Sequence, residues 1–162
     1  MENSQSEPQP STEPVSKTGR GIFPLLWRGF WLAFLVGSLA YAWYCFYTPP
    51  NSVSWVPDYT TAQEQSMQSD KPMILFFTAT WCVPCRIMKR TVWADEQVAT
   101  EVNERFIPLM VYADDPDMAK VFSRYRVGAT PTTLITDSQG NVLQWVQGKI
   151  EKAELLKLLE TR

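Results

Sequence analysis

Trp81-Cys82-Val83-Pro84-Cys85 gives the clearest indication of how this chain folds. The apolar run from Met73 to Phe77 precedes it and predicts a buried strand. Two cysteines separated by two residues can form a disulfide across the first turn of a helix. The sequence therefore predicts a strand that leads to a cysteine pair, and a helix that begins at this pair.

The chemistry of the pair follows from this placement. The thiolate, not the thiol, attacks a disulfide, and the unpaired N–H groups and the dipole at a helix N-terminus favour the anion. Cys82 is therefore the predicted nucleophile, which forms a mixed disulfide with a substrate. Cys85, one turn further along and away from solvent, is the predicted resolving thiol. Pro84 fits a first helical turn, where its missing N–H has no helical partner. The pattern predicts a thiol-disulfide oxidoreductase.

Other uses of a cysteine pair require residues that this chain does not have. A tetrahedral zinc site needs four ligands, but the chain has no histidine and no second closely spaced cysteine pair. Haem attachment needs a histidine directly after the second cysteine, where Arg86 stands instead. An iron–sulfur cluster needs about four thiolates, and the chain has 3 cysteines. We expect no metal and no cofactor. An inert disulfide, or two unreactive thiols, is the alternative to redox activity.

From about Ser69 to Leu159 the chain resembles a thioredoxin-fold domain. The resemblance is carried by the cysteine stretch 81–85 and by Gly128-Ala129-Thr130-Pro131-Thr132. It implies an α/β fold with a mixed central sheet and helices on both faces. It also implies a cis Thr130–Pro131 bond that faces the cysteine pair, while an ordinary trans proline at a strand start is the alternative. The docking surface that it implies for an extended substrate consists of Trp81, Val83, Pro84, Thr130 and Pro131.

The stretch after the pair narrows the resemblance within the thioredoxin-like superfamily. Its carrying residues are Cys85-Arg86-Ile87-Met88, Thr91-Val92-Trp93, Asp95 and Val98. They are similar to the carboxy-terminal thioredoxin-like domain of membrane thiol-disulfide interchange reductases, which lies outside the cytoplasm and passes electrons to other periplasmic proteins. Two departures concern proton transfer. Thioredoxins carry a buried Asp where this chain has Phe76, and a Lys on the next strand, where the run 108–112 has none. The groups that usually move protons to and from the buried sulfur of the second cysteine, here Cys85, are therefore absent from these two positions.

The amino-terminal part of the chain predicts a membrane anchor. Residues 1–20 are rich in Ser, Pro, Glu and Gln, and we expect a disordered tail over residues 1–24. Gly29 to Tyr47 then contains no charged residue. At about 1.5 Å per residue this run is close to the ~30 Å thickness of a bilayer core. Tryptophans near one end, and Trp and Tyr near the other, resemble interfacial aromatic belts. The sequence predicts one transmembrane helix over residues 25–48.

The distribution of charge predicts the orientation of this helix. Lys17, Arg20 and Arg28 precede the span, and no Lys or Arg follows before Lys71. The positive-inside rule therefore places the amino terminus in the cytoplasm and the cysteine pair outside, in a periplasmic or other extracytoplasmic compartment. Two alternatives stay open. One is a signal peptide cleaved after residues 40–42, which have a small-x-small form. The other is a buried core helix, although the segment is apolar around its whole circumference.

Beyond the span we expect a linker over residues 49–57 and the thioredoxin-like domain over residues 58–162. Thr61 to Glu64 fits a capping box, which predicts a helix through Met67. The acidic residues 114, 115 and 117 are expected in a solvated loop at a helix start. The remaining predicted elements are a strand over 73–78, one long helix over 82–103, a strand over 106–112, a short helix over 118–125, strands over 132–136 and 142–146, and a final helix after residue 148.

The functional hypotheses follow from the pair and the anchor together. An exported dithiol faces an oxidising compartment, so a reductant there must be recharged. We expect exported proteins with disulfides or thiols, and a membrane electron donor, as partners; the net charge of -2 gives no indication of nucleic acid. The leading hypothesis is a membrane-anchored disulfide reductase. The alternatives are a disulfide oxidase or isomerase, a thiol donor for cytochrome maturation, and a binding module with an idle cysteine pair, which Phe76 favours.

Overall fold

The computed structural model of the chain describes residues 22–160. The chain divides into two compact units, one that ends at Cys45 and one that begins at Phe46. In the first unit, helix α1 spans Ile22–Phe46, so residues 22–24 of the expected tail are helical. The rest of that tail, residues 1–21, lies outside the described residues.

Helix α1 is long and apolar enough to cross a membrane over Phe23–Phe46. Its large apolar side chains are exposed on every side, and none of the span is buried. A helix of this length could instead be the core helix of a globular domain, but such a helix would be mostly buried. The span shows no such burial, so it lacks the feature that is typical of a core helix.

The second unit is built around a mixed sheet of four strands in the order β2-β1-β3-β4. The strands span Met73–Thr78 (β1), Ile107–Tyr112 (β2), Thr132–Thr136 (β3) and Val142–Gln147 (β4). β1 pairs with β2 in parallel and with β3 antiparallel, and β3 pairs with β4 antiparallel. All residues of β1 are buried, because it is central and helices cover both of its faces. The expected α/β thioredoxin fold is confirmed.

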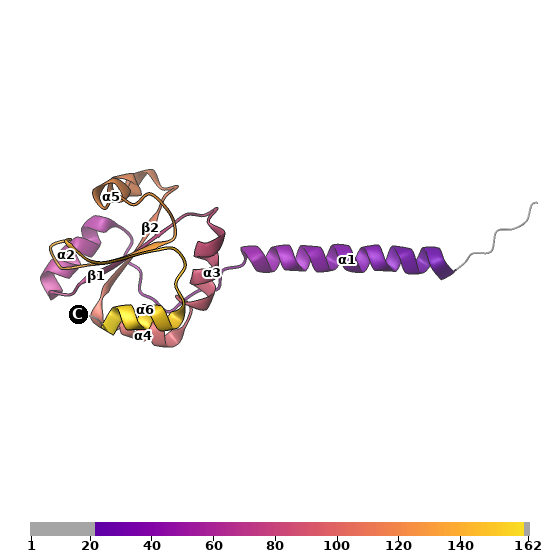
Figure 1. Cartoon of the computed structure of the whole chain (residues 1–162), viewed down its shortest axis with the longest axis horizontal. Helices are drawn as coiled ribbons and strands as arrows, with labels where there is room; N and C mark the ends of the chain where they lie inside the picture. Colours follow the sequence, from indigo (N-terminus) through magenta and orange to yellow (C-terminus); the bar gives the residue numbers. More distant parts are fainter. Residues whose placement is uncertain (1–21, 161–162) are drawn as a thin grey trace, which may run out of the picture. The chain divides into compact units, whose positions relative to one another are not determined.

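Successive side chains of β1 point to opposite faces of the sheet and supply two separate cores. Phe76 lies in the core that is covered by helices α3 (Val83–Thr91), α4 (Glu96–Arg105) and α6 (Lys152–Glu160). Phe77 lies in the opposite core, beneath helices α2 (Tyr59–Ser69) and α5 (Ala119–Arg124). Figure 1 shows α4 and α6 on one side of the sheet and α5 on the other. A short 3-10 turn, Pro116–Met118, leads into α5.

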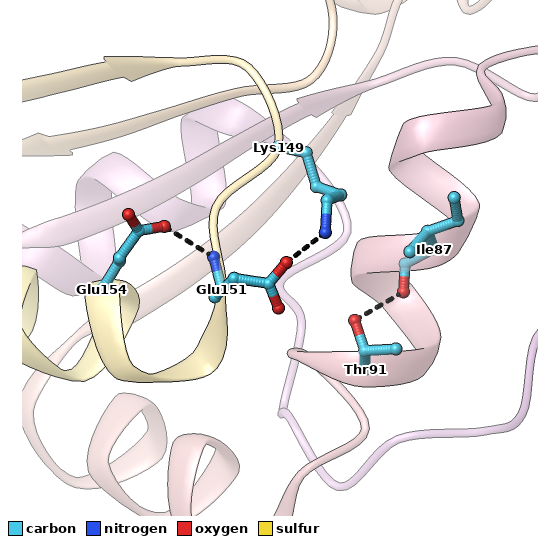
Figure 2. Close-up of polar contacts among 5 residues, drawn as sticks. All are labelled: Ile87, Thr91, Lys149, Glu151 and Glu154. Carbon is cyan, nitrogen blue, oxygen red and sulfur yellow. Dashed lines mark hydrogen bonds and ion pairs between the residues drawn. The ribbon is translucent and has the colours of Figure 1, made fainter.

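The single long helix predicted over residues 82–103 is wrong, because the chain forms two helices there. Helix α3 ends at Thr91, whose hydroxyl donates to the carbonyl of Ile87 at 3.0 Å (Figure 2). Helix α4 begins after Asp95, whose carboxylate caps it by accepting from the amides of Gln97 and Val98. The break lets the fully buried Trp93 enter the core. In one continuous helix Asp95 could not cap α4, and Trp93 would not lie in a turn between two helices.

Three further boundaries differ from expectation. Helix α2 begins at Tyr59 rather than Thr61, because Asp58 is its cap and accepts from the Thr61 amide at 2.9 Å. The short helix predicted over 118–125 is split, since Pro116 opens a 3-10 turn before α5. The strand expected over 106–112 begins one residue later, at Ile107. The strand predictions for 73–78 and 132–136 are confirmed.

The segment 51–56, within the expected linker, packs against the domain. Val53 and Val56 are buried, and the Val56 amide donates to the Pro108 carbonyl at 2.9 Å, beside β2. The Trp55 ring meets the Trp93 ring edge-on, with 5.0 Å between the ring centroids. The polypeptide is therefore fixed to the domain a few residues after α1 ends.

Polar contacts fix the start of α6 on the same side of the sheet as α3. The Glu154 side chain accepts from the Glu151 amide at 2.8 Å, and Lys149 forms an ion pair with Glu151 (Figure 2). Lys152 approaches the Asp95 carboxylate to 2.8 Å and so joins α6 to the cap of α4. Its hydrogen bond is the main cause that lowers the pKa of Asp95 from its ordinary value.

Candidate active site

The cysteine pair lies where β1 has ended and α3 begins. Cys82 is the N-cap residue of α3, and Cys85 is in its first turn. The two form a disulfide with 5.3 Å between their Cα atoms. The Sγ of Cys82 accepts a hydrogen bond from the Cys85 amide at 3.2 Å, so it receives one of the unpaired N–H groups of the helix N-terminus. Cys82 is 3% exposed and Cys85 is 0% exposed, so both residues are buried and Cys82 is slightly the more accessible of the two.

The residues around Cys82 are open to solvent. Trp81 is 68% exposed and Val83 is 55% exposed, and Pro84 is also exposed. The exposed apolar side chains directly before and after Cys82 form a small apolar surface beside the buried disulfide.

The Thr130–Pro131 peptide bond is cis, as the resemblance implies. Pro131 precedes Thr132, which pairs with Phe77 near the end of β1 from which the chain continues to Cys82. The loop and the cysteine pair therefore meet at the same end of the sheet. Gly148 donates its amide to the Pro131 carbonyl at 2.8 Å and has a φ of 103°, a conformation that favours glycine. The Thr130 hydroxyl is buried and has no hydrogen-bond partner among the described residues.

The position of the usual buried acid is filled by aromatic packing. Phe76 is fully buried in the core cluster that also holds Cys82 and Cys85. Its ring lies 5.2 Å from that of Trp93, measured between centroids. β2 lacks the lysine that thioredoxins carry on this strand, but a lysine of helix α3 reaches its end. Lys89 is 8% exposed, and its Nζ donates to the hydroxyl of Tyr112, the last residue of β2, at 3.1 Å.

Thr80 and Asp114 are a part of the site that sequence reasoning missed. The Asp114 carboxylate accepts from the Thr80 hydroxyl at 2.6 Å and from the Thr80 amide at 3.2 Å. The hydroxyl hydrogen bond is the main cause that lowers the pKa of Asp114 from its ordinary value. Arg86, whose direction the sequence left unknown, donates to the Thr80 carbonyl at 3.2 Å. The contact could have been expected only from the sheet topology: β1 and β2 are parallel, so the loops that follow them, with Thr80 and Asp114, lie at the same end of the sheet.

No group of three or more His, Cys, Asp or Glu side chains that could hold a metal ion occurs within residues 22–160. The feature that the structure does place at this end of the sheet is the Cys82–Cys85 disulfide. A CxxC disulfide at the start of a helix, in this sheet topology and beside a cis-proline loop, defines a thiol-disulfide oxidoreductase with a thioredoxin fold.

Comparison with known proteins gives the family. Residues 59–162 match the family of the thioredoxin-like domain, and the chain belongs to that family. Among curated proteins, the thiol:disulfide interchange protein DsbD of Campylobacter jejuni is 23% identical over 110 residues, which cover 67% of this chain and 19% of DsbD. The chain thus spans about a fifth of the length of that relative.

Solved structures agree with this assignment. A thioredoxin from Thermus thermophilus is similar with a TM-score of 0.59 and 26% identity, over 67% of this chain and 85% of the thioredoxin. The carboxy-terminal domain of Neisseria meningitidis DsbD, in its reduced form, is similar with a TM-score of 0.53 and 24% identity, over 62% of this chain and 90% of that domain. The predicted resemblance to the carboxy-terminal domain of the interchange reductases is confirmed.

Proposed function

We propose that this protein is a membrane-anchored reductase of disulfides in exported proteins, and that Cys82 and Cys85 carry the reaction. The observation that carries the proposal is the buried Cys82–Cys85 disulfide at the N-terminus of α3, with exposed Trp81 and Val83 beside it. A thiol-disulfide oxidoreductase needs a sulfur that is stabilised as a thiolate and a surface on which a substrate can dock.

In this proposal, Cys82 is the nucleophile. The Cys85 amide that donates to its Sγ would stabilise a thiolate after reduction, as would the helix dipole. The first turn of α3 contains no acidic residue to oppose the anion. Cys85, which is fully buried, is reached by Cys82 and not by a bulky substrate.

The electrons balance over two exchanges. The Cys82 thiolate attacks one sulfur of the substrate disulfide, which releases the other substrate sulfur as a thiolate and forms a mixed disulfide. The Cys85 thiolate then attacks the Sγ of Cys82 and releases the second substrate thiolate. The substrate gains two electrons and the pair becomes the disulfide. A dithiol donor in the membrane must supply two electrons to reduce the pair again.

The docking surface is formed by residues from two segments. Trp81, Val83 and Pro84 are exposed around Cys82. Thr130 and Pro131 lie in the loop at the same end of the sheet, with the Pro131 carbonyl already bound to the Gly148 amide. The exposed apolar groups would contact substrate side chains, and the loop backbone would pair with an extended substrate segment.

We assign α1 as a single-pass anchor, with the amino terminus in the cytoplasm and the domain in the periplasm or another extracytoplasmic compartment. The apolar exposed surface of α1 and the basic residues before it, Arg28 among them, support this assignment. Segment 51–56 is bound to the domain, so the free tether after α1 is short. A short tether raises the effective concentration of the pair near a membrane donor.

Alkaline carbonate washing of membranes tests the anchor. We expect the full chain to stay in the membrane pellet, because a spanning helix of this length is not removed when peripheral proteins are stripped. A washed-off protein whose amino terminus begins just after residue 42 would instead establish the cleaved signal peptide.

The reduction potential of the pair tests the proposed direction of electron flow. We expect a titration of the full chain in detergent against glutathione to give a value at or below about −220 mV, while a value near about −120 mV would identify an oxidase. A pair that never closes would remove both redox functions and leave a binding module.

A further inference from the structure

All three backbone and side-chain polar groups of Thr80, the residue directly before Trp81, are hydrogen-bonded. Its amide and hydroxyl both donate to the Asp114 carboxylate, at 3.2 and 2.6 Å. Its carbonyl accepts from the Arg86 guanidinium at 3.2 Å. We call Thr80, Asp114 and Arg86 the Thr80 clamp. Two of its three residues are charged, and hydrogen bonds to ionised groups are the stronger kind.

The clamp encloses the cysteine pair along the chain. Thr80 lies two residues before Cys82 and Arg86 directly after Cys85, so the Arg86–Thr80 bond joins the two ends of the segment that holds the disulfide. Asp114 fixes this segment from outside, since it follows β2, and the Ala113 amide donates to the Thr78 carbonyl at 2.8 Å. The clamp thus attaches the cysteine segment to the end of the sheet.

The Thr80 clamp joins two exposed residues. Thr80 and Asp114 both lie at the surface, where water can satisfy a hydroxyl and a carboxylate without cost. The bonds of the clamp act on the backbone directly before Trp81, whose side chain is 68% exposed.

We propose that Asp114 is a positioning residue for substrate docking: through the Thr80 clamp it holds Trp81 at a fixed place beside Cys82, so that a protein disulfide meets a preformed surface. This inference rests on the proposed function. Preorganised surfaces bind more tightly because less order has to be imposed on binding. The clamp therefore acts on the affinity for protein substrates and not on the reactivity of the disulfide itself.

The test measures the kinetics of insulin disulfide reduction by the full chain in detergent, with dithiothreitol as the electron source. For Asp114→Ala we expect KM for insulin to rise about three- to tenfold, the size of one or two lost hydrogen bonds. We expect kcat, and the rate at which dithiothreitol alone reduces the Cys82–Cys85 disulfide, to stay as in the wild type. Thr80→Val should behave like Asp114→Ala, and Thr80→Ser should retain a low KM.

Asp117→Ala is the matched control, because Asp117 lies three residues further along the same acidic stretch and does not bond to Thr80. Its KM should equal that of the wild type. An unchanged KM in both Asp114→Ala and Thr80→Val, with an active wild type, overturns the clamp and leaves the proposed function standing. A wild type that does not reduce insulin overturns the proposed function, and the docking role of the clamp with it.

Discussion

Cys82→Ser in the full chain will lower the rate of insulin disulfide reduction by about 10³-fold or more, as expected when a covalent nucleophile is removed. A serine hydroxyl has nearly the shape of the thiol, but it is not ionised near neutral pH and does not attack sulfur. The N-cap position can still accept the Cys85 amide in the variant, so the fold is retained. The measurement is the initial rate of insulin reduction.

Cys85→Ser separates the two roles of the pair. Cys82 can still attack a substrate disulfide in this variant, but no thiol remains to resolve the mixed disulfide, so partners should stay covalently attached until a reductant is added. Non-reducing electrophoresis of the variant shows these adducts. Cys45→Ser is the control, because Cys45 is the free cysteine within the described residues and lies in α1.

Two results would contradict these roles. Adducts that form through Cys85 in the Cys82→Ser variant, at the same yield, would reverse the assignment of nucleophile and resolving thiol. Partners that co-purify equally well when both cysteines are serine would instead identify a binding module with an idle pair.

Trp93→Ala will lower the free energy of unfolding by about 3–5 kcal/mol, the usual cost when a large aromatic side chain is removed from a core. That is a large part of the roughly 5–15 kcal/mol that stabilises a typical domain. Trp93 is fully buried between Trp55 and Phe76, with centroid distances of 5.0 and 5.2 Å. Its indole N–H has no hydrogen-bond partner within the described part of the chain, so the loss comes from packing.

Urea unfolding of the full chain in detergent, followed by circular dichroism, measures this loss. Trp145→Ala is the matched control: Trp145 lies on the edge strand β4 and is 40% exposed, so its removal should cost clearly less than the removal of the fully buried Trp93. Equal losses for the two variants would show that the core is not organised around Trp93.

The sequence predicted those strands and helices that are specified by residues close together along the chain. The uninterrupted apolar run of β1, and a cysteine pair with a proline in the first turn of α3, describe a strand and a helix start that neighbouring residues alone specify. The length and the apolar circumference of α1 likewise require no other part of the chain. The cis Thr130–Pro131 bond came from the resemblance, and not from local residues.

Contacts between distant residues decided the rest. The helical periodicity of the sequence continues past Thr91, yet helix α3 ends there. The chain turns because Trp93 packs against the ring of Trp55, 38 positions earlier in the sequence, and because Asp95 caps a second helix. From the sequence, segment 51–56 is predicted to be a linker. In the structure it is docked on the domain, because Val56 forms a backbone bridge with Leu109 of β2.

Residue types at short spacing were enough to predict the cysteine pair, the central strand β1, the long apolar helix α1 and the class of chemistry. The residues that surround the pair depend instead on how the strands and helices pack in three dimensions. The parallel alignment of β1 and β2 places Asp114 against Thr80 across 34 positions of sequence, and α3 brings Lys89 to Tyr112. Such contacts depend on how the strands are aligned in the sheet, and a local pattern of residues does not specify that alignment.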